Sequence, residues 1–168
     1  MPIETLRDLY VEQLNELYAA EKHGLRALPE LVEAASSPVL ADAIEDLIQQ
    51  KRQRLDRLEE IFEDSDIRPH ARETRGMKGL LEDCLALSHN KKVEPHVRDA
   101  ALIALAQHVE HDEIAGYGCA RTWAQVLGEH DAAALLEKSL KDEKDADARL
   151  SKMARSINQE AMMAAFPE

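Results

Sequence analysis

Four long stretches of the chain repeat apolar residues every three or four positions, and each stretch ends where proline, glycine or paired serines appear. This spacing predicts one amphipathic helix for each stretch. Helices of about 25 to 30 residues are two to three times the usual length, which is typical of antiparallel bundles. We predict long helices over about residues 5–35, 39–64, 96–127 and from 130 or 131 past 157, with a short helix over about 74–88.

The order of these helices predicts an all-α fold in one domain, residues 1–168. The long helices form two hairpins, and the connection between the hairpins is longer and holds the short helix. A ferritin-like four-helix bundle with one long crossover requires this order, although a plain up-down bundle stays open. Thr5 and Asp8 predict a capping box at the start of the first helix, and residues 166–168 are left unassigned.

Composition excludes several classes of protein. With 45% hydrophobic and 32% charged residues the chain is globular, not disordered. A net charge of −12 argues against a nucleic-acid partner. There is no apolar run near the ~20 residues that cross a membrane and no secretory signal pattern at Met1, so we expect a cytoplasmic protein. Cys84 and Cys119 form no CxxC motif and are expected to be reduced.

Several acidic residues lie on stripes that should face the core. Glu21 lies four residues from Leu17 on one side and four from Leu25 on the other. The apolar stripe of helix 96–127 is filled in the middle by Glu110 and Glu113, and that of the last helix by Glu143 and Asp147. We therefore predict five inward carboxylates.

An ionised carboxylate in a bundle core costs several kcal/mol unless it is protonated, paired or bound to metal. One acid on an apolar stripe more often lies at its edge. Five together indicate a shared counter-charge, and two metal ions held by inward glutamates are a known solution in helical bundles. Because the ligands are hard oxygens, iron or manganese suits them better than zinc.

Five segments of the chain form a recognisable pattern. The segments are LYAAEK at 17–22, MxGL at 77–80, DAALI at 99–103, VEHxEIAxYG at 109–118 and DEKxxD at 142–147. Together they resemble the YciE/YciF family of ferritin-like bacterial proteins, over nearly the whole chain. The resemblance implies a dimeric ferritin-like bundle, a dinuclear metal site and a link to stress responses. The ligands that it implies are Glu21, Glu110, Glu113 and Glu143, with Asp147 as a fifth candidate.

The second helix departs from the family pattern, which has a further carboxylate there. The aligned stretch reads QQKRQR over residues 49–54 and contains no acid. Its apolar stripe passes through Lys51 and Arg54, with Gln50 at the edge. Three alternatives stay open. The site is mononuclear or weakened with Gln50 as a ligand, or Arg54 and Lys51 replace the metal in a buried salt-bridge network, or their long side chains reach the surface and the site survives.

Histidines and tyrosines near these acids have less specific interpretations. On a helical projection His108 points opposite the face of Glu110 and Glu113 and His111 lies on the flank of that face, so neither is proposed as a ligand. Tyr18 and Tyr117 lie one turn from inward acids, where a phenol could hydrogen-bond a carboxylate, although ordinary core packing is the interpretation we favour slightly.

Two hypotheses follow. The first is a di-iron or di-manganese type site that oxidises iron or removes peroxide, with a metal ion or small oxidant as substrate, Glu110 and Glu143 as bridging ligands and Glu21, Glu113 and Asp147 as terminal ones. The second is a metal-free bundle with a structural or interaction role, in which Arg54 pairs with Glu110 or Glu143. Under either hypothesis we expect a homodimer. Whether the chain is an enzyme is left open.

Overall fold

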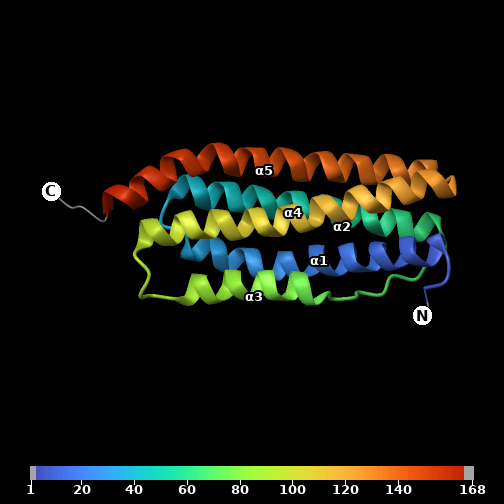
Figure 1. The fold of residues 1–168 in the computed structure, drawn as a ribbon, viewed down its shortest axis with the longest axis horizontal. Helices are drawn as coiled ribbons and strands as arrows, with labels where there is room; N and C mark the ends of the chain where they lie inside the picture. The colour runs from blue at the N-terminus through green and yellow to red at the C-terminus, as the bar shows by residue number, and fades with distance from the viewer. Residues whose placement is uncertain (1–2, 165–168) are drawn as a thin grey trace.

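The computed structural model describes residues 3–164, and over this range the chain is helical with no strand. Each predicted helix is present, with bounds close to those expected from the breaks in the sequence (Figure 1). The proposed tail at 166–168 lies outside the described residues. The helices are α1 (Leu6–Ala34), α2 (Pro38–Asp64), α3 (Arg75–His89), α4 (Pro95–Leu127) and α5 (His130–Ala164).

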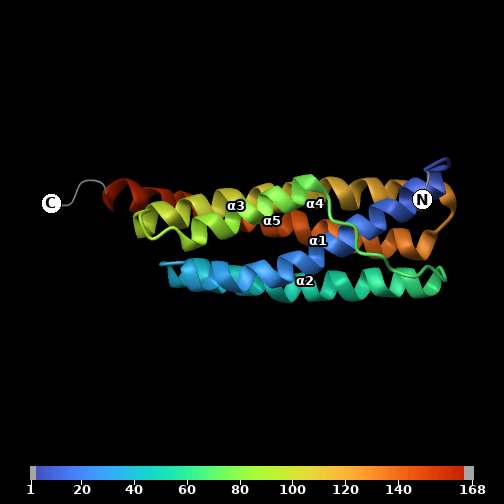
Figure 2. The same cartoon turned by 90° about the horizontal axis from the view of Figure 1, so that it is seen from below.

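The topology is that of a ferritin-like bundle. The pairs α1 with α2 and α4 with α5 are antiparallel hairpins, whereas α2 and α4 run in the same direction (Figure 1). The segment after α2 returns along the side of the bundle and carries α3 back to the start of α4, as Figure 2 shows from below. A plain up-down bundle would begin α4 at the end where α2 stops, so this alternative is excluded.

Local signals in the sequence set the helix ends. The Thr5 side chain accepts a hydrogen bond from the backbone N–H of Asp8, and the Asp8 carboxylate accepts one from the backbone N–H of Thr5, which confirms the predicted capping box. Gly128 ends α4 with φ of 79°, a left-handed conformation that glycine adopts without steric cost.

The core consists of two apolar clusters that are separated by a charged layer at mid-length. One cluster contains Leu28, Leu47 and Leu102, among others, together with the buried face of α3. The other contains Tyr10, Phe62 and Leu136. Among residues 3–164, no helix is long and apolar enough to span a lipid bilayer.

Candidate functional site

Seven buried polar side chains from four helices meet between the two apolar clusters, and we call this set the core charge cluster. Each is at most 2% exposed. Its acidic members confirm the prediction that glutamates from three helices point inward. The members are Glu21 from α1, Lys51 and Arg54 from α2, Glu110, Glu113 and Tyr117 from α4, and Glu143 from α5.

The ammonium group of Lys51 bridges α4 and α1. Its Nζ lies 2.6 and 2.7 Å from the two carboxylate oxygens of Glu113 and 3.2 Å from Glu21 Oε2. All three N–H groups of a lysine ammonium therefore have an acceptor in reach. The side chain does not extend to the surface, so the alternative in which it reaches solvent is wrong for Lys51.

The guanidinium group of Arg54 bridges α1 and α5. Its Nε donates to Glu21 Oε1 at 2.7 Å and lies 2.7 Å from Glu143 Oε1. Of the two partners predicted for Arg54, the structure therefore selects Glu143. Tyr117 completes the shell of Glu21, because its hydroxyl donates to Glu21 Oε1 at 2.6 Å. The hydrogen-bonding role considered for Tyr117 is thus present.

Burial and these contacts shift the pKa values in opposite directions. Burial alone would raise the pKa of Glu21, but Lys51, Arg54 and the Tyr117 hydroxyl together hold it below its usual value. Burial raises the pKa of Glu110, and raises those of Glu113 and Glu143 well above their usual range, because the nearby cations only partly offset desolvation.

The charges of the cluster balance only when protons are counted. Lys51 and Arg54 supply two positive charges against four carboxyl groups. Burial raises the pKa values of Glu110 and Glu143, so both carboxyl groups favour the protonated form more than an exposed glutamate does. Glu110 Oε2 and Glu143 Oε2 have no hydrogen-bond partner in residues 3–164. A proton on one of these two carboxyl groups would reduce the excess of negative charge.

A dinuclear metal centre, as the ferritin-like fold implies, does not fit these residues. One oxygen from each of Glu21, Glu113 and Glu143 lies within 4.8 Å of the others, so three possible ligands do converge. However, the carboxylates of all three lie within 3.2 Å of Lys51 Nζ or Arg54 Nε. Two fixed cations at these oxygens would repel a metal ion strongly at low dielectric. The carboxylates that would bind metal ions already contact cations of the chain.

Asp147 differs from the expectation of an inward acid. It is half-buried, and its Oδ1 accepts a hydrogen bond from Gln107 at 2.9 Å and lies 3.4 Å from His111 Nε2. Four residues advance a helix by about 40° beyond a full turn, which turns Asp147 from the line of Glu143 toward the flank of α4. It lies outside the core charge cluster.

The remaining residues considered from the sequence lie around the cluster. His108 and His111 are exposed, as predicted. Tyr18 packs edge-to-face on Phe62, with ring centroids 5.7 Å apart. Gln50 is half-buried, and its Oε1 has no hydrogen-bond partner in the part of the chain that the structure describes.

Sequence reasoning missed Asp99, which is 1% exposed. Its two carboxylate oxygens accept hydrogen bonds from the backbone N–H groups of Ser36 and Ser37, each at 2.8 Å. The only available signal was its place in the segment 99–103, where it was read as part of a family motif. Its role is to hold the turn between α1 and α2.

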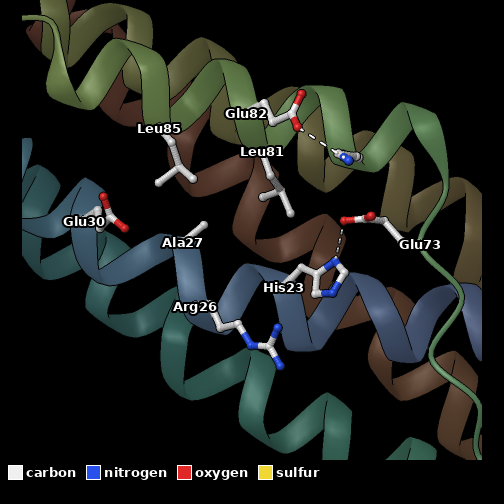
Figure 3. A pocket seen from close by; sticks show the side chains of 9 residues that line it. His23, Arg26, Ala27, Glu30, Glu73, Leu81, Glu82 and Leu85 are labelled. Atoms are coloured by element: carbon white, nitrogen blue, oxygen red, sulfur yellow. Dashed lines mark ion pairs between the residues drawn. The ribbon is translucent and has the colours of Figure 1, made fainter.

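A surface groove of about 290 Å³ lies between α1 and α3 (Figure 3). Ala27, Leu81 and Leu85 form its apolar part. Its rim carries charges of both signs, and His23 Nδ1 lies 3.1 Å from Glu73 Oε1. None of the lining residues belongs to the core charge cluster, so the two features are separate.

A family model described as "Domain of unknown function (DUF892)" matches residues 5–163. The chain belongs to the DUF892 family. This DUF892 protein is 35% identical to protein YciF of Escherichia coli strain K12 over 163 residues, which are 96% of this chain and 98% of YciF. The resemblance seen in the sequence is thereby confirmed.

Solved structures agree with this assignment. The crystal structure of the E. coli stress protein YciF matches with a TM-score of 0.89 at 34% identity, covering 94% of this chain and 99% of that one. YcfI from Rhodopseudomonas palustris matches with a TM-score of 0.84 at 31% identity, covering 89% and 94%. A protein from Xanthomonas campestris, with a TM-score of 0.76 and 17% identity over 96% and 99% of the chains, shares the fold.

Proposed function

We propose that this DUF892 protein is a metal-independent helical bundle with a structural or protein-interaction role in bacterial stress. The observation that carries the proposal is the position of Lys51 Nζ and Arg54 Nε on the oxygens of Glu21, Glu113 and Glu143. In this arrangement the inward glutamates of the ferritin-like bundle bind the side-chain cations of α2 instead of metal ions.

The energetics support a structural role for the core charge cluster. A metal ion at these oxygens would have to displace Lys51 or Arg54, and the displaced cation would then be buried without a partner. Breaking a buried ion pair by removing one partner typically costs about 3–5 kcal/mol. The network therefore resists metal entry and also ties α2 to the three other long helices.

The relatives support the same proposal. The E. coli relative is called a stress protein, and the description of YcfI from R. palustris proposes a structural role for that protein. Both match this chain over most of its length, so a comparable role is the one we extend to it.

A second function is favoured by one observation, the convergence of Glu21, Glu113 and Glu143. If Lys51 moved out of the core, these oxygens would suit iron or manganese, and the chemistry would be oxidation of iron or removal of peroxide. We rank it second because the move separates a buried ammonium from three carboxylate oxygens.

Metal analysis tests the proposal directly. The wild-type protein is expressed with iron and manganese supplements, incubated anaerobically with Fe²⁺ or Mn²⁺, freed of loose metal and analysed by mass spectrometry of the elements. We expect clearly substoichiometric metal, and the same thermal midpoint with and without added metal, because a ligand that binds only the folded state raises that midpoint. Stoichiometric metal in the wild type would contradict the proposal.

A pair of variants tests the structural role. Arg54→Gln should lower the free energy of unfolding by about 3–5 kcal/mol, since it leaves buried acids without their cation. Arg52→Gln removes an exposed arginine from the same helix and should change stability by less than about 0.5 kcal/mol. Equal effects of the two changes in urea unfolding would refute a structural network.

A further inference from the structure

α1 carries a glycine in its middle, at a position that is buried against α2. Glycine in the interior of a helix weakens the helix relative to alanine, because more backbone freedom is lost on folding. Gly24 shows no unusual backbone conformation, since the positive φ angles among the described residues belong to Asp66 and Gly128. Its presence therefore needs an explanation from packing.

The side chain of Lys51 occupies the space beside Gly24. A Cβ added at residue 24 would lie 2.7 Å from Lys51 Cε and 2.8 Å from Cδ, which is closer than real Cβ contacts. The methylene stem cannot simply swing aside, because its Nζ is held by Glu113 and Glu21. A side chain at residue 24 would therefore require the stem of Lys51 to shift.

Two other glycines provide a comparison within the same bundle. A Cβ at Gly116 would lie 2.9 Å from Leu17 Cδ2, so alanine there would clash with an apolar side chain. A Cβ at Gly118 would have no neighbour within 4 Å. Alanine at position 24 would clash with Lys51, alanine at 116 would clash with a residue outside the core charge cluster, and alanine at 118 would clash with nothing. Comparing the three variants therefore isolates the effect of displacing Lys51.

We infer that Gly24 is the positioning residue that closes the core charge cluster to metal ions. It leaves the space along which the stem of Lys51 runs to place the ammonium between Glu21 and Glu113. With alanine at position 24, the stem of Lys51 leaves this space, and the three oxygens that its ammonium holds, both of Glu113 and Oε2 of Glu21, become available to a hard divalent cation. The inference rests on the proposed function, because it explains how metal is excluded.

Manganese titration of three alanine variants tests the inference. Gly24→Ala, Gly116→Ala and Gly118→Ala are titrated with Mn²⁺, and binding is followed by calorimetry and by loss of the electron paramagnetic resonance signal of free Mn²⁺. Only Gly24→Ala is expected to bind Mn²⁺, and adding Glu113→Gln to it should abolish the binding. Gly118→Ala should raise the thermal midpoint, since alanine favours helix and nothing is displaced. If Gly24→Ala behaves like Gly118→Ala, with a raised midpoint and no Mn²⁺ binding, the inference is wrong.

Lys51→Ala keeps the inference testable if Gly24→Ala folds poorly. This change removes the stem that meets residue 24, so Gly24→Ala should lower the thermal midpoint in the wild type but not in the Lys51→Ala background. An equal loss in both backgrounds would overturn the inference. Mn²⁺ binding by the wild type would instead overturn the proposed function. Binding by Lys51→Ala alone, with none by a folded Gly24→Ala, would overturn only the role of Gly24.

Discussion

Tyr117 and Tyr10 are both fully buried tyrosines, but their hydroxyl groups have different surroundings. The Tyr117 hydroxyl donates to Glu21 Oε1 at 2.6 Å, within the core charge cluster. The Tyr10 hydroxyl has no hydrogen-bond partner among residues 3–164, and burial raises the pKa of Tyr10 to about 12. A hydrogen bond to a charged group contributes more than one between neutral groups, so the two phenols should differ in their contribution to stability.

The pair predicts contrasting effects of the same substitution. Tyr117→Phe should lower the free energy of unfolding by about 1.5–3 kcal/mol, because Glu21 loses a charge-assisted hydrogen bond. Tyr10→Phe should be close to neutral or stabilising, since it removes a buried hydroxyl without a partner. Urea unfolding measures both. A neutral Tyr117→Phe would show that its hydroxyl does not stabilise the ionised Glu21.

At the scale of elements, Asp99 joins the two hairpins at one end of the bundle. The N-cap residue of α2, Ser37, makes no side-chain capping bond. The carboxylate of Asp99 in α4 instead accepts from the N–H groups of Ser36 and Ser37. The neighbouring Arg98 donates through Nε to the carbonyl oxygen of Ala34 at 3.1 Å. The turn between α1 and α2 is thus held by side chains of α4, which belongs to the other hairpin.

Removing this cap should loosen the turn and destabilise the protein. Asp99→Ala is expected to cost about 3 kcal/mol, because two backbone N–H groups lose a charged acceptor. Hydrogen exchange should become faster at residues 36 and 37 in particular. Asp46→Ala, at an exposed position of α2, serves as the control and should leave both stability and exchange near wild type. Unchanged exchange in Asp99→Ala would contradict the role of this cap.

At the scale of the whole molecule, the protons of the cluster make stability depend on pH. The folded protein holds a proton more tightly on acids whose pKa values are raised, such as Glu143, than the unfolded chain does, in which the ordinary value is 4.5. Unfolding therefore releases protons above this value, and stability falls as the pH rises. Glu21 has a lowered pKa and acts in the opposite sense, so its contribution is lost only as the pH falls below 4.5.

Glutamine at position 143 should reduce this dependence. At pH values above the ordinary 4.5, Glu143→Gln should flatten the decline of the free energy of unfolding by up to about 1.4 kcal/mol per pH unit, which corresponds to one proton. Glu60→Gln, an exposed acid on α2, should keep the wild-type slope. Urea unfolding at several pH values measures both slopes, and equal slopes would mean that Glu143 carries no proton in the folded state.

The fold and much of the cluster could be predicted because helical periodicity is a local property. The spacing of apolar residues set the helices, and acids in the middle of those stripes, such as Glu21 and Glu143, were correctly placed in the core. Asp147 was misplaced, because a position at the edge of a stripe turns inward or outward according to the neighbouring helix. The homodimer stays a prediction.

Whether the side chains of Lys51 and Arg54 lie in the core or reach solvent could not be predicted, because this depends on contacts between helices. A long basic side chain on an apolar stripe has access to the core or to solvent at similar cost, and sequence spacing does not distinguish the two. The structure decides through Gly24, whose missing Cβ leaves room for Lys51. A glycine facing a lysine on an adjacent helix is the signal that the sequence contained but that was not read.

Lys51 and Arg54 of α2 affect how the stability of the protein depends on the concentration of metal ions in a cell. A bundle whose inward acids bind an ion reaches its full stability only where that ion is abundant. Here the positive charges that neutralise the buried acids are side chains of the protein itself, Lys51 and Arg54. They are present in every copy of the chain. If the bundle is metal-independent, as we propose, starvation for iron or manganese should leave the amount of native protein unchanged.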